Sequence, residues 1–140
     1  MKKTAITLFV CSIIVLSVSA CDCVDDPVYT DFMNLLSEGA LNDAHAMLVH
    51  ELAEHPASPL THILRGEFYF YLAYNKSDLS EDDFNNFVYA TGNAPSSVKA
   101  ENAFRQAFEI DPDCLCACQS LVQILEDNQQ YDEITADFKQ

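Results

Sequence analysis

The sequence AENAFRQAFEIDP, residues 100–112, decides the fold of this chain. Its apolar residues recur at i, i+3, i+4, i+7 and i+8, which is the spacing of one face of an α-helix. They are Ala100, Ala103, Phe104, Ala107 and Phe108. The residue before a proline is disfavoured in helical backbone, so this helix should end at Asp111. Small alanines let a second helix approach closely while the phenylalanines fill the remaining space, and the stretch therefore predicts one half of a helical hairpin.

The segments before this stretch also have helical periodicity, and none alternates as a strand. We expect a helix over residues 31–38, with Thr30 as its N-terminal cap and Gly39 as its C-terminal cap. Asn42 should cap the next helix, and Pro56 should close it. These patterns place a first helical hairpin before residue 57.

An aromatic run, FYFYLAY over residues 68–74, follows Ser58-Pro59, which reads as a helix cap with proline at the first helical position. Aromatic residues favour strands. The neighbouring segments are helical, however, and a strand would have no second strand to pair with, so we expect a helix buried on several sides. In an alternative interpretation this run lines a groove for a peptide, and the candidate partner contacts are Tyr69, Tyr71 and Tyr74.

Further helices are expected towards the C-terminus. Ser80 and Asp83 form an S-x-x-D capping box, and residues 92–97, GNAPSS, form a loop. One helix should follow Pro112, and a short helix should end the chain; the apolar residues of the latter are Tyr131, Ile134 and Phe138. The fold class predicted is all-α, with about six to seven helices in antiparallel hairpins.

Two stretches resemble tetratricopeptide repeats, 34-residue helical hairpins with small and large residues at fixed offsets. The later match is Ala100, Phe104, Ala107 and Pro112, and the earlier match is Gly39, Leu41, Ala44, Leu48 and Pro56. Pro56 and Pro112 are 56 residues apart, 22 more than one repeat, and the excess should hold the aromatic helix or an added helix around Phe84. The resemblance implies a repeat domain over residues 30–140 whose concave surface binds peptides or proteins. The alternative is a generic α-helical bundle.

The first 20 residues have the layout of a secretory signal, with Lys2-Lys3 before an apolar run. The sequence VSAC, residues 18–21, resembles the lipobox of bacterial lipoproteins. That resemblance implies lipidation at Cys21, a short tether over residues 21–29 and a membrane anchor of several acyl chains. It implies an envelope location facing the periplasm, and Asp22 favours the inner membrane. The alternative is ordinary cleavage after Ala20, which would leave a soluble secreted protein.

The chain is strongly acidic, with a formal net charge of −15. Removal of Lys2 and Lys3 with the signal leaves 5 Lys and Arg against 22 Asp and Glu, a net charge of −17. This charge repels nucleic acid and suits a basic protein partner. It is also typical of a solvated helical surface that keeps a protein soluble.

Six cysteines are present, of which Cys11 lies in the signal and Cys21 would carry the lipid. An even number remain as disulfide candidates: Cys23, Cys114, Cys116 and Cys118. A bridge from the first of these to one of the other three would tie the first helix to the last hairpin. The clustered three could instead bind Cu(I) or Zn(II), but one of them points away from the other two on a helix, so no metal site is expected.

We expect no catalytic residues, no cofactor and no small-molecule substrate. The sequence HELAEH, residues 50–55, departs from the zinc-peptidase motif because its histidines are five residues apart rather than four. His45 and His62 are expected at the surface or facing within a hairpin. The favoured function is a lipid-anchored helical-repeat adaptor in the bacterial envelope. The alternatives are an acidic immunity-type inhibitor of a basic toxin and, less favoured, thiol or metal handling by the cysteine cluster.

Overall fold

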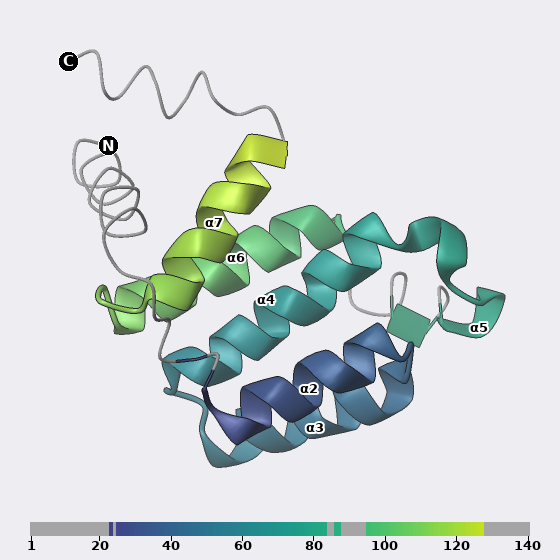
Figure 1. Ribbon diagram of the computed structural model, residues 1–140, viewed down its shortest axis with the longest axis horizontal. Coiled ribbons are helices and arrows are strands. Elements are labelled where there is room, and N and C mark those ends of the chain that lie inside the picture. Colours follow the sequence, from purple (N-terminus) through teal and green to yellow (C-terminus); the bar gives the residue numbers. More distant parts are fainter. Residues whose placement is uncertain (1–22, 24, 84–85, 88–94, 128–140) are drawn as a thin grey trace.

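The computed structural model describes residues 23, 25–83, 86–87 and 95–127 (Figure 1). All regular elements among these residues are helices. The elements are α2 (Pro27–Ser37), α3 (Leu41–Glu54), α4 (Pro59–Tyr74), the 3-10 helix η1 (Lys76–Asp78), α5 (Glu81–Asp83), α6 (Ser96–Ile110) and α7 (Leu115–Asp127). No strand occurs in this part of the chain, which confirms the all-α class. None of the helices in the described ranges has the length and apolar character needed to cross a bilayer. The predicted C-terminal helix lies outside the described residues.

Helix α2 begins four residues before the predicted start. Asp26 is its N-cap, and the Asp26 carboxylate accepts a hydrogen bond of 2.8 Å from the Val28 amide. Pro27 occupies the first helical position, where its fixed φ and missing N–H fit a helix start. Thr30 therefore lies inside the helix, and its hydroxyl donates to the Asp26 carbonyl. The prediction of Thr30 as the cap was wrong because an Asp-Pro pair upstream starts the helix more effectively.

Gly39 ends α2 as predicted, with a φ of +72° that only glycine adopts without strain. The Gly39 amide donates a hydrogen bond to the Leu36 carbonyl, and the Ala40 amide donates one to the Leu35 carbonyl. These two hydrogen bonds form a Schellman turn. This turn runs directly into α3, whose N-cap is Ala40 without a side-chain hydrogen bond. The prediction that Asn42 caps α3 was therefore wrong. Pro56 follows the end of α3, as expected.

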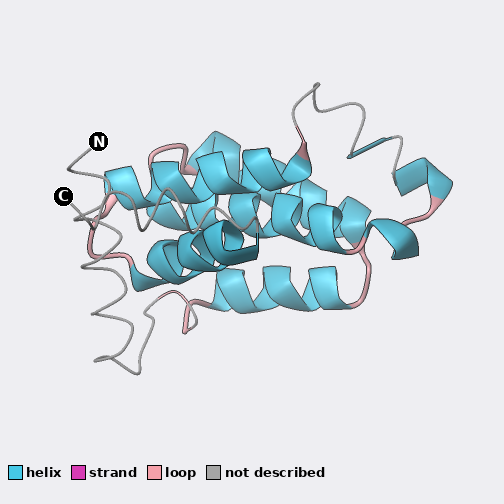
Figure 2. Ribbon diagram, turned by 90° about the horizontal axis from the view of Figure 1, so that it is seen from above, coloured by secondary structure: helices cyan, strands magenta, loops and turns pink. Residues whose placement is uncertain are grey.

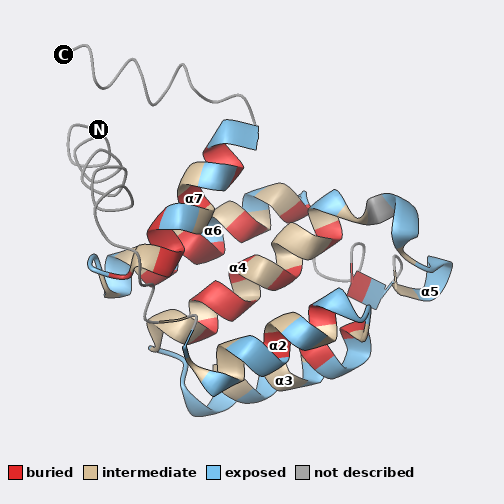
Figure 3. Ribbon diagram, viewed as in Figure 1, coloured by how far each residue is buried: buried red, intermediate tan, exposed pale blue. Residues whose placement is uncertain are grey.

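The aromatic run forms part of α4, which confirms the helical assignment over a strand. Ser58 precedes the first helical residue, as predicted, but its side chain makes no capping hydrogen bond. Helix α4 contacts α2, α3, α6 and α7, so it is the central helix of the described body (Figure 1). Phe68 and Leu72 are buried, whereas Tyr74 at the end of the helix is 47% exposed. Figure 3 shows buried and half-buried residues along most of α4.

Helices α4 and α6 share the largest interface in the described body. Ala100, Ala103, Phe104 and Ala107 are fully buried, as their spacing predicted. The Phe104 ring lies directly over Gly66 of α4, and a Cβ atom added to Gly66 would be 2.5 Å from the Phe104 Cε1 atom. The aromatic helix α4 packs on α6. The connection between α4 and α6 holds η1 and α5, and Ser80 and Asp83 form the predicted capping box at α5.

Two apolar clusters form the core, one on each side of α4. The first joins α2, α3, α4 and Phe87. The second joins α4, α6 and α7, with Cys23 packed against it. Tyr69 packs against both clusters. In Figure 2 the described helices run alongside one another without a sheet between them, and their packing forms the core of the described body.

Candidate functional site

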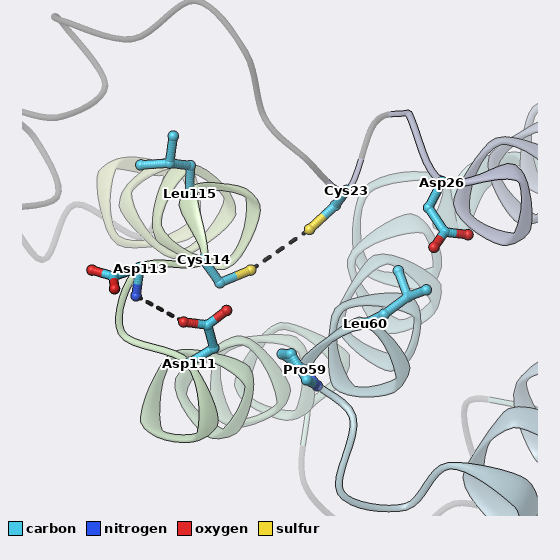
Figure 4. A pocket seen from close by; sticks show the side chains of 8 residues that line it. All are labelled: Cys23, Asp26, Pro59, Leu60, Asp111, Asp113, Cys114 and Leu115. Atoms are coloured by element: carbon cyan, nitrogen blue, oxygen red, sulfur yellow. Dashed lines mark hydrogen bonds between the residues drawn. The ribbon is translucent and has the colours of Figure 1, made fainter.

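Cys23 and Cys114 meet beside the start of α7, although they are 91 residues apart in sequence. Their sulfur atoms lie 3.6 Å apart (Figure 4). Both line a pocket of about 180 Å³, whose other lining residues are Asp26, Pro59, Leu60, Asp111, Asp113 and Leu115. Cys23 also packs against the second core cluster. The predicted tether over residues 21–29 is therefore wrong in its later part, because the folded body already includes Cys23 and the start of α2.

The Cys114 thiol is placed so that its ionised form is stabilised. Cys114 immediately precedes α7, and its carbonyl accepts the Cys118 amide at 3.2 Å, so it occupies the N-cap position. The hydrogen bond from Cys23 lowers the pKa of Cys114 to about 7, with further lowering by the backbone amides of Ala117 and Cys116. Burial and the Asp111 charge act in the opposite direction. At neutral pH a large fraction of Cys114 is thiolate, the nucleophilic form of cysteine.

Three carboxylates surround this thiol pair, and local hydrogen bonds hold two of them in place. Asp26 caps α2, as described above, and Asp111 accepts a hydrogen bond of 3.1 Å from the Asp113 amide (Figure 4). The pocket therefore combines two thiols with an acidic lining. Such a lining repels anionic reagents and tolerates neutral or cationic ones.

The other two predicted disulfide cysteines lie on α7 and are buried. Cys116 and Cys118 are disulfide-bonded, and Cys114 instead faces Cys23. Among the described residues, no group of three or more His, Cys, Asp or Glu side chains is arranged to hold a metal ion. The cluster of three cysteines is thus divided by the fold between two kinds of contact. Cys21, the predicted lipidation site, lies outside the described residues.

A half-buried carboxyl lies between α4 and α7. Glu67 of α4 accepts a hydrogen bond of 3.1 Å from the Ser120 hydroxyl of α7, and burial raises the pKa of Glu67. Tyr29 of α2 has its pKa raised to about 12 by burial, with smaller contributions from the charges of Glu67 and Cys23. Sequence motifs gave no indication of these residues. The only available signal was a glutamate directly before an aromatic run that is otherwise apolar.

The three tyrosines predicted as partner contacts lie in different environments. Tyr69 and Tyr71 are half-buried and pack against the core, and the Lys99 ammonium lies 5.4 Å from the Tyr69 ring centre. Tyr74 is exposed, and its ring lies 4.4 Å from that of Phe70. Burial raises the pKa of Tyr74, and the charge and hydrogen bond of Asp127 on α7 add to the effect. Tyr74 is the most exposed of the three tyrosines.

The histidines do not come together as a site. His45 packs between the rings of Phe68 and Phe87, at centroid distances of 5.6 and 5.2 Å. His50 and His55, the two histidines of HELAEH, are both exposed. The Nε2 atom of His62 is 3.0 Å from the Pro56 carbonyl oxygen, and burial lowers the pKa of His62.

The surface of the described body is acidic because exposed carboxylates far outnumber basic side chains. Arg65 donates to Gln106 at 2.7 Å, and Arg105 forms an ion pair with Glu101 at 2.8 Å. Many acidic residues are exposed: Asp25, Asp31, Glu38, Asp43, Glu54, Asp78, Glu81, Asp82, Glu109, Asp113, Glu126 and Asp127. The surface therefore offers carboxylates in excess of cations to any partner.

Comparison with protein-family models, with curated proteins and with solved structures found no match to this chain.

Proposed function

We propose that this protein is a lipid-anchored envelope protein whose helical body binds a basic partner protein. The observation that carries the proposal is the pairing of Tyr74 with Asp127, an exposed aromatic ring beside a carboxylate where the C-terminal ends of α4 and α7 meet. Aromatic rings supply contact area and attract cations, and a carboxylate accepts hydrogen bonds from Lys or Arg. The acidic surface around this pair would speed the approach of a basic partner.

The helix contacts support the repeat interpretation. Helix α2 contacts α4, and α4 contacts α7, so the first helices of successive hairpins would lie side by side. The small Gly66 against the large Phe104 accords with the small and large offsets of tetratricopeptide repeats. In such repeats this row of first helices forms the binding surface, and Tyr74 and Asp127 both belong to it.

An immunity-type inhibitor of a basic toxin is the second candidate, and the excess of exposed carboxylates favours it. An inhibitor would bind one basic protein tightly through charge, and its binding would weaken steeply with salt. An adaptor would bind several resident envelope proteins and keep part of that binding at high salt through the apolar contact of Tyr74. The number of partners and the fraction of binding that survives high salt therefore separate the two candidates.

The test is capture of partners from an envelope extract by the immobilised full chain at low and high salt. We expect binding to fall about tenfold in the Tyr74→Ala variant and several-fold in Asp127→Asn, since interface aromatics contribute about 1–3 kcal/mol. Val49→Ala is the matched control, because Val49 is a similarly exposed apolar residue on α3. Equal binding by all three variants, or no bound protein in either salt condition, would contradict the proposal.

The anchor is tested separately. Cys21→Ala should move the protein from the membrane fraction to the soluble fraction if that thiol carries the lipid. A membrane-bound variant would contradict lipidation at this position without affecting the proposed binding surface.

A further inference from the structure

We propose that Cys23 and Cys114 form a dithiol site that closes to a disulfide and so fixes the start of the folded body to the N-terminus of α7. This inference does not depend on the proposed partner binding. It assigns chemistry to a pair of side chains that the sequence left among three possible pairings.

Geometry singles out this pairing. The two sulfur atoms are 3.6 Å apart, and a shift of about 1.5 Å brings them to the distance of a disulfide bond. Cys114 follows the turn between α6 and α7, and Cys23 precedes α2 (Figure 4). Helix packing has already brought these distant segments together. The movement that remains for disulfide formation is the shift of about 1.5 Å between the two sulfur atoms. Cys116 and Cys118 lie further along α7 and are disulfide-bonded.

The two thiols differ in exposure and in ionisation, which suits them to different steps of the reaction. Cys23 is the more exposed of the two, and Cys114 is 7% exposed. The hydrogen bond from Cys23 favours the Cys114 thiolate in the reduced pair, and the backbone amides of Ala117 and Cys116 at the start of α7 still favour it once Cys23 is in a mixed disulfide. Cys23 is therefore suited to meet an external reagent, and Cys114 is suited to attack the sulfur of Cys23 in the step that closes the ring.

The oxidant required is a disulfide, either a small molecule or another protein. In the first step the Cys23 thiol loses its proton and attacks one sulfur of the reagent, forming a mixed disulfide and releasing one thiolate. In the second step the Cys114 thiolate attacks the Cys23 sulfur and releases the other half of the reagent as a thiolate. Two protein thiols are oxidised, one reagent disulfide is reduced to two thiols, and the two protons pass to the released thiolates.

The acidic lining predicts which disulfides react fastest. Asp26, Asp111 and Asp113 line the same pocket as the two thiols, so a cationic disulfide is attracted and an anionic one is repelled. Cystamine is a dication and oxidised glutathione is an anion at neutral pH. We expect cystamine to react several-fold faster at low salt, and this difference should shrink as salt screens the carboxylates.

The experiment follows which cysteines can be alkylated in the full chain. The chain is first prepared with Cys23 and Cys114 as thiols. It is then incubated with cystamine or oxidised glutathione, and the thiols that remain are alkylated. Cleavage before aspartates then separates residues 22–24 from residues 113–126. In the wild-type chain, Cys23 and Cys114 should lose alkylation together, and mass spectrometry should find residues 22–24 linked to residues 113–126. Fragmentation of this linked peptide should place the bond on Cys114, because Cys116 and Cys118 lie in the same peptide. In Cys114→Ser, Cys23 should stop at the mixed disulfide, seen as the mass of one reagent half on residues 22–24, and no linked peptide should form. Cys11→Ser, a matched substitution in the predicted signal, should behave as the wild type.

Three results would overturn the proposal: Cys23 still alkylated in the wild-type chain after oxidation, a peptide linking Cys23 to residues 113–126 in Cys114→Ser, or Cys23 linked in the wild-type chain to a cysteine other than Cys114. The linked peptide is read from the wild-type chain, so the test stands even if the Cys114→Ser variant folds poorly. Equal rates with the two reagents at low salt would overturn the charge preference and leave the pairing itself supported by the linked peptide.

Discussion

The α4–α6 interface and the junction around Cys114 are built from opposite kinds of residue. At the interface, the Phe104 ring covers the backbone at Gly66, and buried alanines flank it. At the junction, two thiols lie at the start of α7, and further along α7 Ser120 is hydrogen-bonded to a half-buried carboxyl, Glu67 of α4. The interface joins two helices that each follow a regular apolar pattern, whereas the junction joins residues from separate parts of the chain.

The two regions contribute differently: the interface stabilises the fold, and the junction holds groups that can ionise or be oxidised. Burial of uncharged groups stabilises the fold at every pH, since nothing there gains or loses a proton. Burial of ionisable groups disfavours their charged forms and makes their surroundings sensitive to pH and to oxidants. We therefore expect substitutions at the interface to change stability by similar amounts at all pH values, and substitutions at the junction to have effects that depend on pH.

The largest expected effect is that of Phe104→Ala at the interface. Removing this fully buried ring should lower the free energy of unfolding by about 4 kcal/mol, because it leaves a cavity over Gly66. Urea denaturation followed by circular dichroism under reducing conditions measures the change. Phe108→Ala is the matched control, since Phe108 is half-buried on the same helix and should cost clearly less. Equal losses in the two variants would contradict the account of this interface.

A smaller loss is expected from Gly66→Ala. Alanine is favoured over glycine in a helix by about 1 kcal/mol, yet the added methyl would lie 2.5 Å from the Phe104 ring. Overpacking of this kind costs about 1–3 kcal/mol, so we expect a net loss of stability. Combining Gly66→Ala with Phe104→Leu should remove the clash, and the double variant should be more stable than the sum of the single losses predicts. Additive losses would mean that Gly66 and Phe104 are not coupled.

At the junction, Glu67→Gln should stabilise the protein at neutral pH. Burial raises the pKa of Glu67, so the folded state holds its proton to a higher pH than the unfolded state does. The stabilisation from the neutral carboxyl is present below the unfolded pKa and is lost as pH rises through the folded pKa. Glutamine stays neutral and can still accept the Ser120 hydrogen bond. Unfolding experiments should show a gain at pH 7 that disappears near pH 4.

Glu101→Gln is the matched control for that measurement. Glu101 forms an ion pair with Arg105 on the same helix, and its loss should lower stability at pH 7 by about 0.3–0.5 kcal/mol. A destabilised Glu67→Gln protein at pH 7 would show that the buried carboxylate is compensated by interactions other than the Ser120 hydrogen bond.

Sequence periodicity was sufficient for the regular parts of the fold. The stripe around Phe104, the stop at Asp111 and the turn at Gly39 all follow from local rules, and the structure has each of them. Helix starts were harder to predict because several residues compete to cap a helix. Thr30 and Asn42 are good caps by composition, but Asp26-Pro27 and the Schellman turn lie earlier in the chain and start the helices first.

The candidate site could be predicted only in part. The sequence indicated a bridge from Cys23 to one of three clustered cysteines, and the fold brings Cys114 next to it. The choice among the three depends on which cysteine lies at the start of α7, and that follows from helix boundaries that cysteine spacing does not reveal. Glu67 could not be identified beforehand, because its burial results from the packing of α7 against α4.

The central claim is that the junction holds a reactive thiol whose ionisation depends on its neighbour. The most direct measurement is the alkylation rate of Cys114 against pH in the reduced full chain, resolved by mass spectrometry of its peptide. We predict a midpoint near pH 7, because the Cys114 pKa is lowered to about 7, and a clear upward shift in Cys23→Ala, since the hydrogen bond from Cys23 is the largest cause of the lowering and alanine has no donor. A midpoint near pH 9 in the wild-type chain, or no shift in Cys23→Ala, would contradict the claim.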